Sequence, residues 1–81
     1  MLQLGEEAMA VQVVMDHSGD TRHWYDAADE QSLFEARERF RELSKQGYIA
    51  AVRGTEGTSR IVHSFEPAAE ETLFFPRLVG G

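Results

Sequence analysis

Residues 29–47, with the sequence DEQSLFEARERFRELSKQG, carry the clearest helical pattern in the chain. Apolar side chains recur there at steps of three and four residues, which places them in one stripe along an α-helix. Charged residues fill most other positions, so we expect the opposite side of the helix to face solvent. One amphipathic helix cannot bury its stripe alone, and the segment therefore predicts a second layer of structure. The stripe is formed by Leu33, Ala36 or Arg37, Phe40 and Leu43.

Both ends of the helix are marked by residues that favour its start or its termination. Asp26 or Asp29 can cap the first turn with a side-chain oxygen. Ser32 and Glu35 also have the spacing of a capping box. Gly47 is suited to the position after the last turn, where the backbone often needs a positive φ.

The segments on either side of the helix predict β-hairpins. Val11, Val13 and Met15 recur at a period of two, and we expect them on the buried face of a first strand. Residues 16–20 and 54–58 are rich in turn-forming residues, so each is expected to reverse the chain. Proline cannot donate a hydrogen bond to a strand ladder, so we expect Pro67 to lie in the connection between the last two strands. The predicted strands are 11–15, 21–25, 48–53, 60–65 and 72–75.

This order of elements predicts the α+β class. The arrangement that buries all apolar faces packs the helix across one side of a mixed sheet, with the first and last strands adjacent near its centre. That arrangement is the β-grasp, β-β-α-β-β-β. We expect a leader at 1–8, one domain at 9–76 and a flexible tail at 77–81. Seven of the eight aromatic residues are expected mostly in the core; they are Trp24, Tyr25, Phe34, Phe40, Phe65, Phe74 and Phe75.

Composition restricts the classes of function. The chain has 81 residues, with eight basic and fourteen acidic side chains and a net charge of −6. This charge disfavours binding to nucleic acid or to an anionic membrane. The chain contains no cysteine, which excludes disulfides, thiolate zinc sites and a cysteine nucleophile. No apolar run approaches the length of a bilayer span and no signal segment is evident, so we expect a cytoplasmic protein.

The first predicted turn carries the only grouping that suggests metal or catalytic chemistry. Asp16, His17, Asp20 and His23 have ligand atoms that suit divalent ions, but their spacing matches no diagnostic metal site. Ser18 lies beside His17, and neighbours on a tight turn cannot adopt nucleophile–base geometry. We therefore interpret these residues as a solvated turn and expect no metal, no cofactor and no enzymatic activity.

The sequence ends at residues 71–81 with ETLFFPRLVGG, and this segment resembles the ubiquitin-like family. In ubiquitin-like modifiers, a strand containing Thr-Leu is similarly followed by Arg, Leu, a further residue and Gly-Gly. The order of elements and the chain length resemble that family over about residues 9–81. Members of the family occur in bacteria beside conjugation-type enzymes and in sulfur-carrier pathways, and the resemblance implies either setting.

The resemblance implies that the protein is a substrate of activation and not a catalyst. Gly81 would supply the carboxylate that a separate ATP-dependent activating enzyme adenylates, and Gly80 would fit a narrow enzyme channel. Arg77 and Leu78 would be recognised by the activating enzyme or by a deconjugating protease. A conjugating enzyme and a protein target are the further implied partners. The choice between protein conjugation and sulfur carriage stays open.

Several positions depart from ubiquitin itself. Val79 replaces a basic residue and Pro76 stiffens the base of the tail. The apolar patch of ubiquitin includes a leucine in the first turn, where this chain has residues 17–19, His-Ser-Gly. A different interaction surface could involve Ile49, Phe74 or Phe75. Lys45 is the only lysine and thus the one internal acceptor for an isopeptide bond.

The alternative function is a small non-enzymatic interaction domain, phage-associated or regulatory, with an inert tail. Such a domain could form a homodimer by pairing strand edges, which satisfies exposed backbone groups. It would bind its partner without Gly80 or Gly81.

Overall fold

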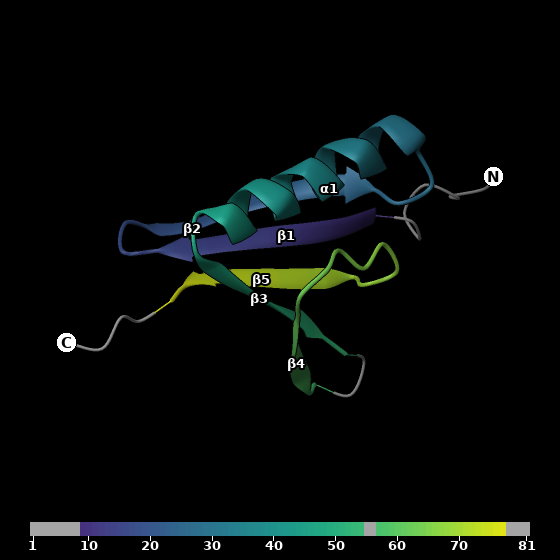
Figure 1. Ribbon diagram of the computed structural model, residues 1–81. Coiled ribbons are helices and arrows are strands. Elements are labelled where there is room, and N and C mark those ends of the chain that lie inside the picture. Colours follow the sequence, from purple (N-terminus) through teal and green to yellow (C-terminus); the bar gives the residue numbers. More distant parts are fainter. Residues whose placement is uncertain (1–8, 55–56, 78–81) are drawn as a thin grey trace.

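The computed structural model describes residues 9–54 and 57–77, and the described residues form one helix on a five-stranded mixed sheet (Figure 1). The order of elements is the one predicted from the sequence. The predicted α+β class is confirmed. The elements are β1 (Met9–Asp16), β2 (Gly19–Asp26), α1 (Glu30–Lys45), β3 (Tyr48–Arg53), β4 (Ser59–Val62) and β5 (Glu71–Pro76).

The strand order across the sheet is β2-β1-β5-β3-β4. Strands β1 and β5 are parallel, with Val13 opposite Leu73. The other neighbouring strands are antiparallel, and Ala51 of β3 lies opposite Leu73 on the other side of β5. The predicted contact between the first and last strands is thus confirmed. Strand β5, from which the chain continues to the tail, lies in the middle of the sheet.

Asp29 caps the start of α1. Its Oδ2 accepts a hydrogen bond from the backbone N–H of Ser32 at 2.8 Å, and Oγ of Ser32 accepts one from the N–H of Asp26 at 2.8 Å. The capping pair is therefore Asp29 with Ser32, and the predicted Ser32–Glu35 capping box is wrong. At the other end, Gly47 has a φ of 96°, which confirms its predicted role in terminating the helix.

The core lies between α1 and one face of the sheet. Phe40 of α1 meets Phe74 of β5 edge to face, with ring centroids 5.5 Å apart. Phe65 closes the side of this core, 6.2 Å from Phe40 and 5.9 Å from Tyr25. Residues 60–65 were predicted as one strand, but β4 ends at Val62. If the strand continued, Phe65 would lie on the same face as Ile61, away from the helix. The chain leaves the sheet after Val62, and Phe65 packs on the helix side instead.

Val11 and Val13 are buried, as predicted, at 6% and 2% exposure, but the face of β1 that meets the helix is the opposite one. Gln12 is fully buried, and its Nε2 donates to the carbonyl oxygen of Ala36 in α1 at 3.0 Å. Because successive strand residues alternate between faces, Val11, Val13 and Met15 lie on the side away from α1. We call that side the open face. Its apolar residues are Val11, Val13, Met15, Trp24, Ile49, Ala51, Ile61, Leu73 and Phe75.

Two of the seven aromatic side chains predicted for the core are exposed. Trp24 is 61% exposed; it pairs with Val11 on the open face, but it belongs to the edge strand β2. Phe34 lies outside the apolar stripe of α1 and is 53% exposed. Among the described residues, no helix has the length and apolarity needed to span a bilayer.

Candidate functional site

The predicted tail begins where the description of the structure ends. Leu78, Gly80 and Gly81 lie outside the described residues, as does the expected leader at 1–8. Arg77 is described and exposed, directly after Pro76 at the end of the central strand. It borders a hollow of about 540 Å³ between the β1–β2 turn and the segment that links α1 to β3. The side chain is therefore accessible to a protein that approaches this end of the sheet.

The β1–β2 turn has its own hydrogen bonds. Oδ1 of Asp16 accepts from the N–H of Ser18 at 2.8 Å and from its Oγ at 2.6 Å. These hydrogen bonds stabilise the charged carboxylate and lower the pKa of Asp16. The hydroxyl of Ser18 is thus engaged with a carboxylate. Within residues 9–54 and 57–77, no group of three or more acidic, histidine or cysteine side chains is placed to hold a metal ion.

Lys45, the candidate isopeptide acceptor, lies in the last turn of α1. Its Nζ is 3.7 Å from a carboxylate oxygen of Glu42, and both side chains are more than half exposed. Exposed pairs of this kind contribute little free energy, so the amine is free to leave the carboxylate. The amine of Lys45 is therefore accessible to a conjugating enzyme, as an isopeptide acceptor must be.

The three residues proposed for an interaction surface do not lie together. Phe74 is completely buried against Phe40, because it occupies the helix-facing side of the central strand. Its assignment to a surface is wrong. Ile49 and Phe75 pair across β3 and β5, and both are half-buried on the open face.

The exposed members of the open face were not identified from the sequence. Trp24 on β2 and Ile61 on β4 are 61% and 51% exposed, and these two strands are the edges of the sheet. One feature of the sequence could have indicated that Trp24 is exposed. Trp24 and Tyr25 are consecutive on a strand, so only one of them can face the core. Tyr25 is the buried one, and its hydroxyl lies 3.5 Å from the carbonyl oxygen of Ala69.

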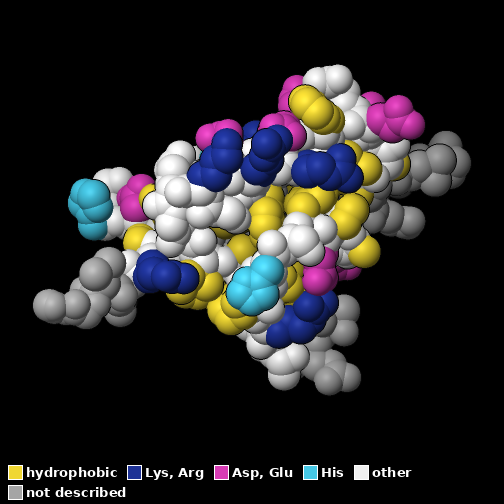
Figure 2. Space-filling view, viewed as in Figure 1, with side chains coloured by type: hydrophobic (Ala, Val, Ile, Leu, Met, Phe, Trp, Pro, Cys, Tyr) yellow, Lys and Arg dark blue, Asp and Glu magenta, His cyan; other side chains and the backbone are white. Residues whose placement is uncertain are grey.

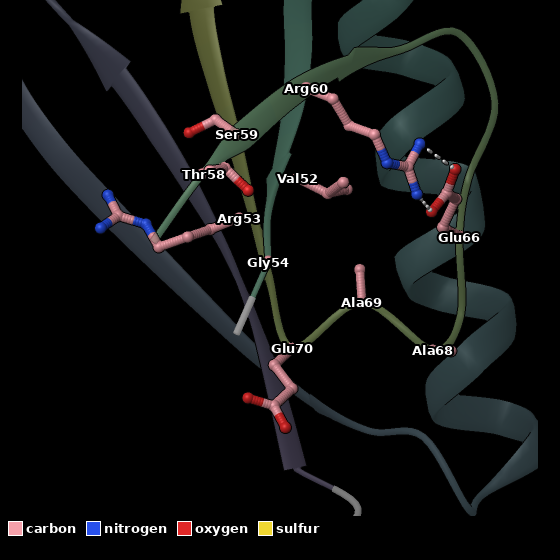
Figure 3. A pocket seen from close by; sticks show the side chains of 10 residues that line it. All are labelled: Val52, Arg53, Gly54, Thr58, Ser59, Arg60, Glu66, Ala68, Ala69 and Glu70. Atoms are coloured by element: carbon pink, nitrogen blue, oxygen red, sulfur yellow. Dashed lines mark hydrogen bonds and ion pairs between the residues drawn. The ribbon is translucent and has the colours of Figure 1, made fainter. Parts of the chain in front are cut away.

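A hollow of about 330 Å³ lies between the β3–β4 hairpin and the segment that leads to β5 (Figure 3). Arg60 donates two hydrogen bonds to Glu66 there, at 2.7 and 3.0 Å, and they lower the pKa of the Glu66 carboxyl. Arg53 is turned away from that pair and contacts Glu71 at 3.1 Å. Each arginine therefore already has a carboxylate partner. Among the described residues that line the hollow, none carries an unpaired positive charge with which to select an anion.

Arg77, the open face and this hollow all border the five-stranded sheet. No protein-family model, curated protein or solved structure matches the chain, so its function is argued from the fold and from these surfaces.

Proposed function

We propose that the chain is a ubiquitin-like modifier or carrier with a β-grasp fold. The observation that carries the proposal is the position of β5. This strand is central and parallel to β1, while a single helix crosses one face of the sheet. The segment that follows β5 is Arg77-Leu78-Val79-Gly80-Gly81, the same segment that resembles the tails of ubiquitin-like modifiers. Fold and tail sequence thus support one function.

In the proposed reaction the chain supplies only a carboxylate. An oxygen of the Gly81 carboxylate attacks the α-phosphorus of ATP in a separate activating enzyme, and pyrophosphate leaves. A thiol of a partner then attacks the acyl carbon and releases AMP. Transfer to a lysine amine forms an amide and regenerates the thiol. Exposed Arg77 would bind the activating enzyme, and Gly80 would pass its channel without a Cβ.

Tryptic digestion provides a direct test for conjugation. The chain would be expressed with an amino-terminal tag in the organism that encodes it, and tagged products would be purified under denaturing conditions. Trypsin cuts after Arg77, so a conjugated target would keep Leu-Val-Gly-Gly on a lysine. A carrier would instead show sulfur in place of one oxygen at Gly81 in the intact mass of the free protein.

The matched control lacks only Gly81. This variant should keep the circular dichroism spectrum and the unfolding midpoint of the parent protein, because the change lies beyond β5. It should yield neither the lysine remnant nor the sulfur-containing form. If the parent protein also yields neither product while it is well expressed, the proposal is wrong.

A second candidate function is that of a homodimeric interaction domain. It is favoured by the exposure of Trp24 and Ile61 on the same face of the two edge strands. Edge strands have unpaired backbone groups, and exposed apolar side chains beside them favour contact with another sheet. This function would not require Gly81.

Trp24 is the only tryptophan, so its fluorescence reports directly on the open face. For a dimer, the sedimentation coefficient should rise with protein concentration while the emission maximum moves to shorter wavelength. Trp24→Ser or Ile61→Ser should abolish the rise, and deletion of Gly80 and Gly81 should leave it unchanged. A constant sedimentation coefficient across the concentration range would exclude the dimer.

A further inference from the structure

A groove separates the carboxyl-terminal half of α1 from the segment that leads from β4 to β5. It is open to solvent and has a volume of about 440 Å³, and we call it the basic groove. Its floor contains the rings of Phe40 and Phe65, and its walls carry Arg37, Arg41, Lys45 and His63. Figure 2 shows this face: Lys and Arg side chains follow the helix above a hydrophobic patch. The groove therefore combines an apolar floor with a positively charged rim.

The cationic side chains form one row. Arg37, Arg41 and Lys45 are spaced by four residues, which aligns them along one side of a helix. Among the described residues that line the groove, none is acidic. This local positive charge contrasts with the net charge of −6 of the whole chain.

The cations are only weakly engaged by the protein itself. Arg41 and Lys45 lie 3.7 Å from Glu38 and Glu42, respectively, and the four side chains are between 39% and 63% exposed. Such pairs contribute about 0–1 kcal/mol, so a competing carboxylate can replace them at little cost. The guanidinium of Arg37 lies 5.6 Å from the ring centroid of Phe65, and none of the ion pairs between described residues involves it.

The floor and the far wall are held in place before any partner arrives. Phe65 packs against both Phe40 and Tyr25. The next residue, Glu66, is held by the two hydrogen bonds from Arg60. A preformed groove loses little conformational entropy on binding, which favours recognition even of a short ligand.

We propose that the basic groove binds an acidic peptide segment of a protein partner. One large apolar side chain of the peptide lies on Phe40 and Phe65, and flanking carboxylates meet Arg37, Arg41 and Lys45. The row spans about 12 Å at 1.5 Å per helical residue. An extended peptide advances about 3.3 Å per residue, so the matching segment is about four to five residues long.

The chemistry of the groove selects a peptide over a polyanion. A nucleic acid or an anionic membrane could also bind the rim, but its charge extends well beyond the groove and is repelled by more of the acidic surface than a peptide of five residues is. The apolar floor requires a bulky apolar group close to the carboxylates. Aspartate or glutamate on both sides of an aromatic or long aliphatic residue satisfies both conditions. This inference does not depend on the chemistry proposed for Gly81.

The test is an NMR titration of the full-length, ¹⁵N-labelled protein with the peptide acetyl-Glu-Asp-Phe-Glu-Asp-amide. Amide shifts should be concentrated at Arg37, Arg41, Lys45 and residues 63–65, and the affinity should fall from low salt to about 0.3 M NaCl. Two control peptides, one with glutamine and asparagine for the acids and one with glycine for phenylalanine, should bind at least about tenfold more weakly.

Charge-matched variants complete the test. R37Q/R41Q should weaken binding about tenfold or more. R22Q/R53Q makes the same change in net charge on the other side of the sheet, and it should bind like the parent protein. The amide spectrum of each variant verifies its fold.

Four outcomes would overturn the proposal. They are no binding at millimolar peptide, shifts elsewhere, equal effects of the two double variants, or binding of phosphatidylserine vesicles or a single-stranded oligonucleotide at these residues in preference to the peptide.

Discussion

At the scale of single residues, Gln12 connects the two layers of the protein. Its amide nitrogen donates to the carbonyl oxygen of Ala36, and its Oε1 accepts from Nη1 of Arg39 at 2.8 Å. A buried amide is unfavourable unless its polar atoms have partners, and both ends of this amide have one. The hydrogen bonds fix the register of α1 against β1. A polar residue in a buried position thus specifies how helix and sheet meet.

We expect Gln12→Ala to lower the free energy of unfolding by about 2–3 kcal/mol, because it removes both hydrogen bonds and leaves a cavity. Urea denaturation would measure the change. Gln31→Ala is the control, since Gln31 is exposed and its hydrogen bond to Glu35 lies at the surface. The control should cost about 0.5 kcal/mol or less. Equal losses in the two variants would mean that Gln12 does not hold the layers together.

His23 gives stability a dependence on pH. Burial lowers the pKa of His23, and the positive charge of Arg39 lowers it further. The ordinary value is 6.5, so the unfolded chain binds more protons than the folded one between that value and the lower folded pKa. The free energy of unfolding should therefore fall as pH decreases through 6.5. Below the pKa that His23 has in the folded protein, further acidification should cause no additional loss of stability through His23.

Thermal unfolding between pH 5 and about pH 8 would measure this effect. His23→Gln should remove the part of the pH dependence that His23 causes. His63→Gln, a substitution at an exposed histidine outside the strands, should preserve it. An unchanged profile in His23→Gln would contradict the assignment.

At the scale of elements, the sequence predicts the features that depend on residues close together in the chain. The stripe of α1 and its terminating Gly47 were predictable, because helical spacing and a positive φ depend on nearby residues. The face of β1 was not. The apolar alternation of Val11 and Val13 correctly indicated that these side chains are buried, but it did not show which face the helix covers. Gln12 meets the helix through hydrogen bonds with residues more than twenty positions away. A partner distant in sequence outweighed the local pattern.

The end of α1 provides a clean test of local conformation. Gly47 has a φ of 96°, and a Cβ at this position would meet no atom within 4 Å. Gly47→Ala should therefore cost about 1 kcal/mol through the backbone alone. Gly54→Ala is the matched control, because Gly54 lacks a positive φ and its Cβ would make ordinary contacts at 3.6 Å. Urea denaturation of both variants would measure the difference. Equal stabilities would contradict a requirement for glycine at Gly47.

At the scale of the whole molecule, the basic groove lies next to the hollow beside Arg77. Ser44 borders both the basic groove and the hollow beside Arg77. A peptide in the groove would thus lie near the base of the proposed tail, while the open face would stay accessible on the other side of the sheet. Binding of a peptide by the groove and recognition of Arg77 would then use adjoining surfaces. The core beneath them must hold helix and sheet in one orientation.

The same substitution, phenylalanine to alanine, at two positions tests the packing of that core. Phe74 is fully buried on the central strand and contacts Phe40 of the helix, so Phe74→Ala removes packing between the layers. It should lower the free energy of unfolding by about 3–5 kcal/mol. Phe34 is 53% exposed on α1, and Phe34→Ala should cost about 1 kcal/mol or less. Urea denaturation would measure both. The arrangement of helix and sheet would be wrong if Phe34→Ala were the more destabilising variant, because the helix would then bury a different side.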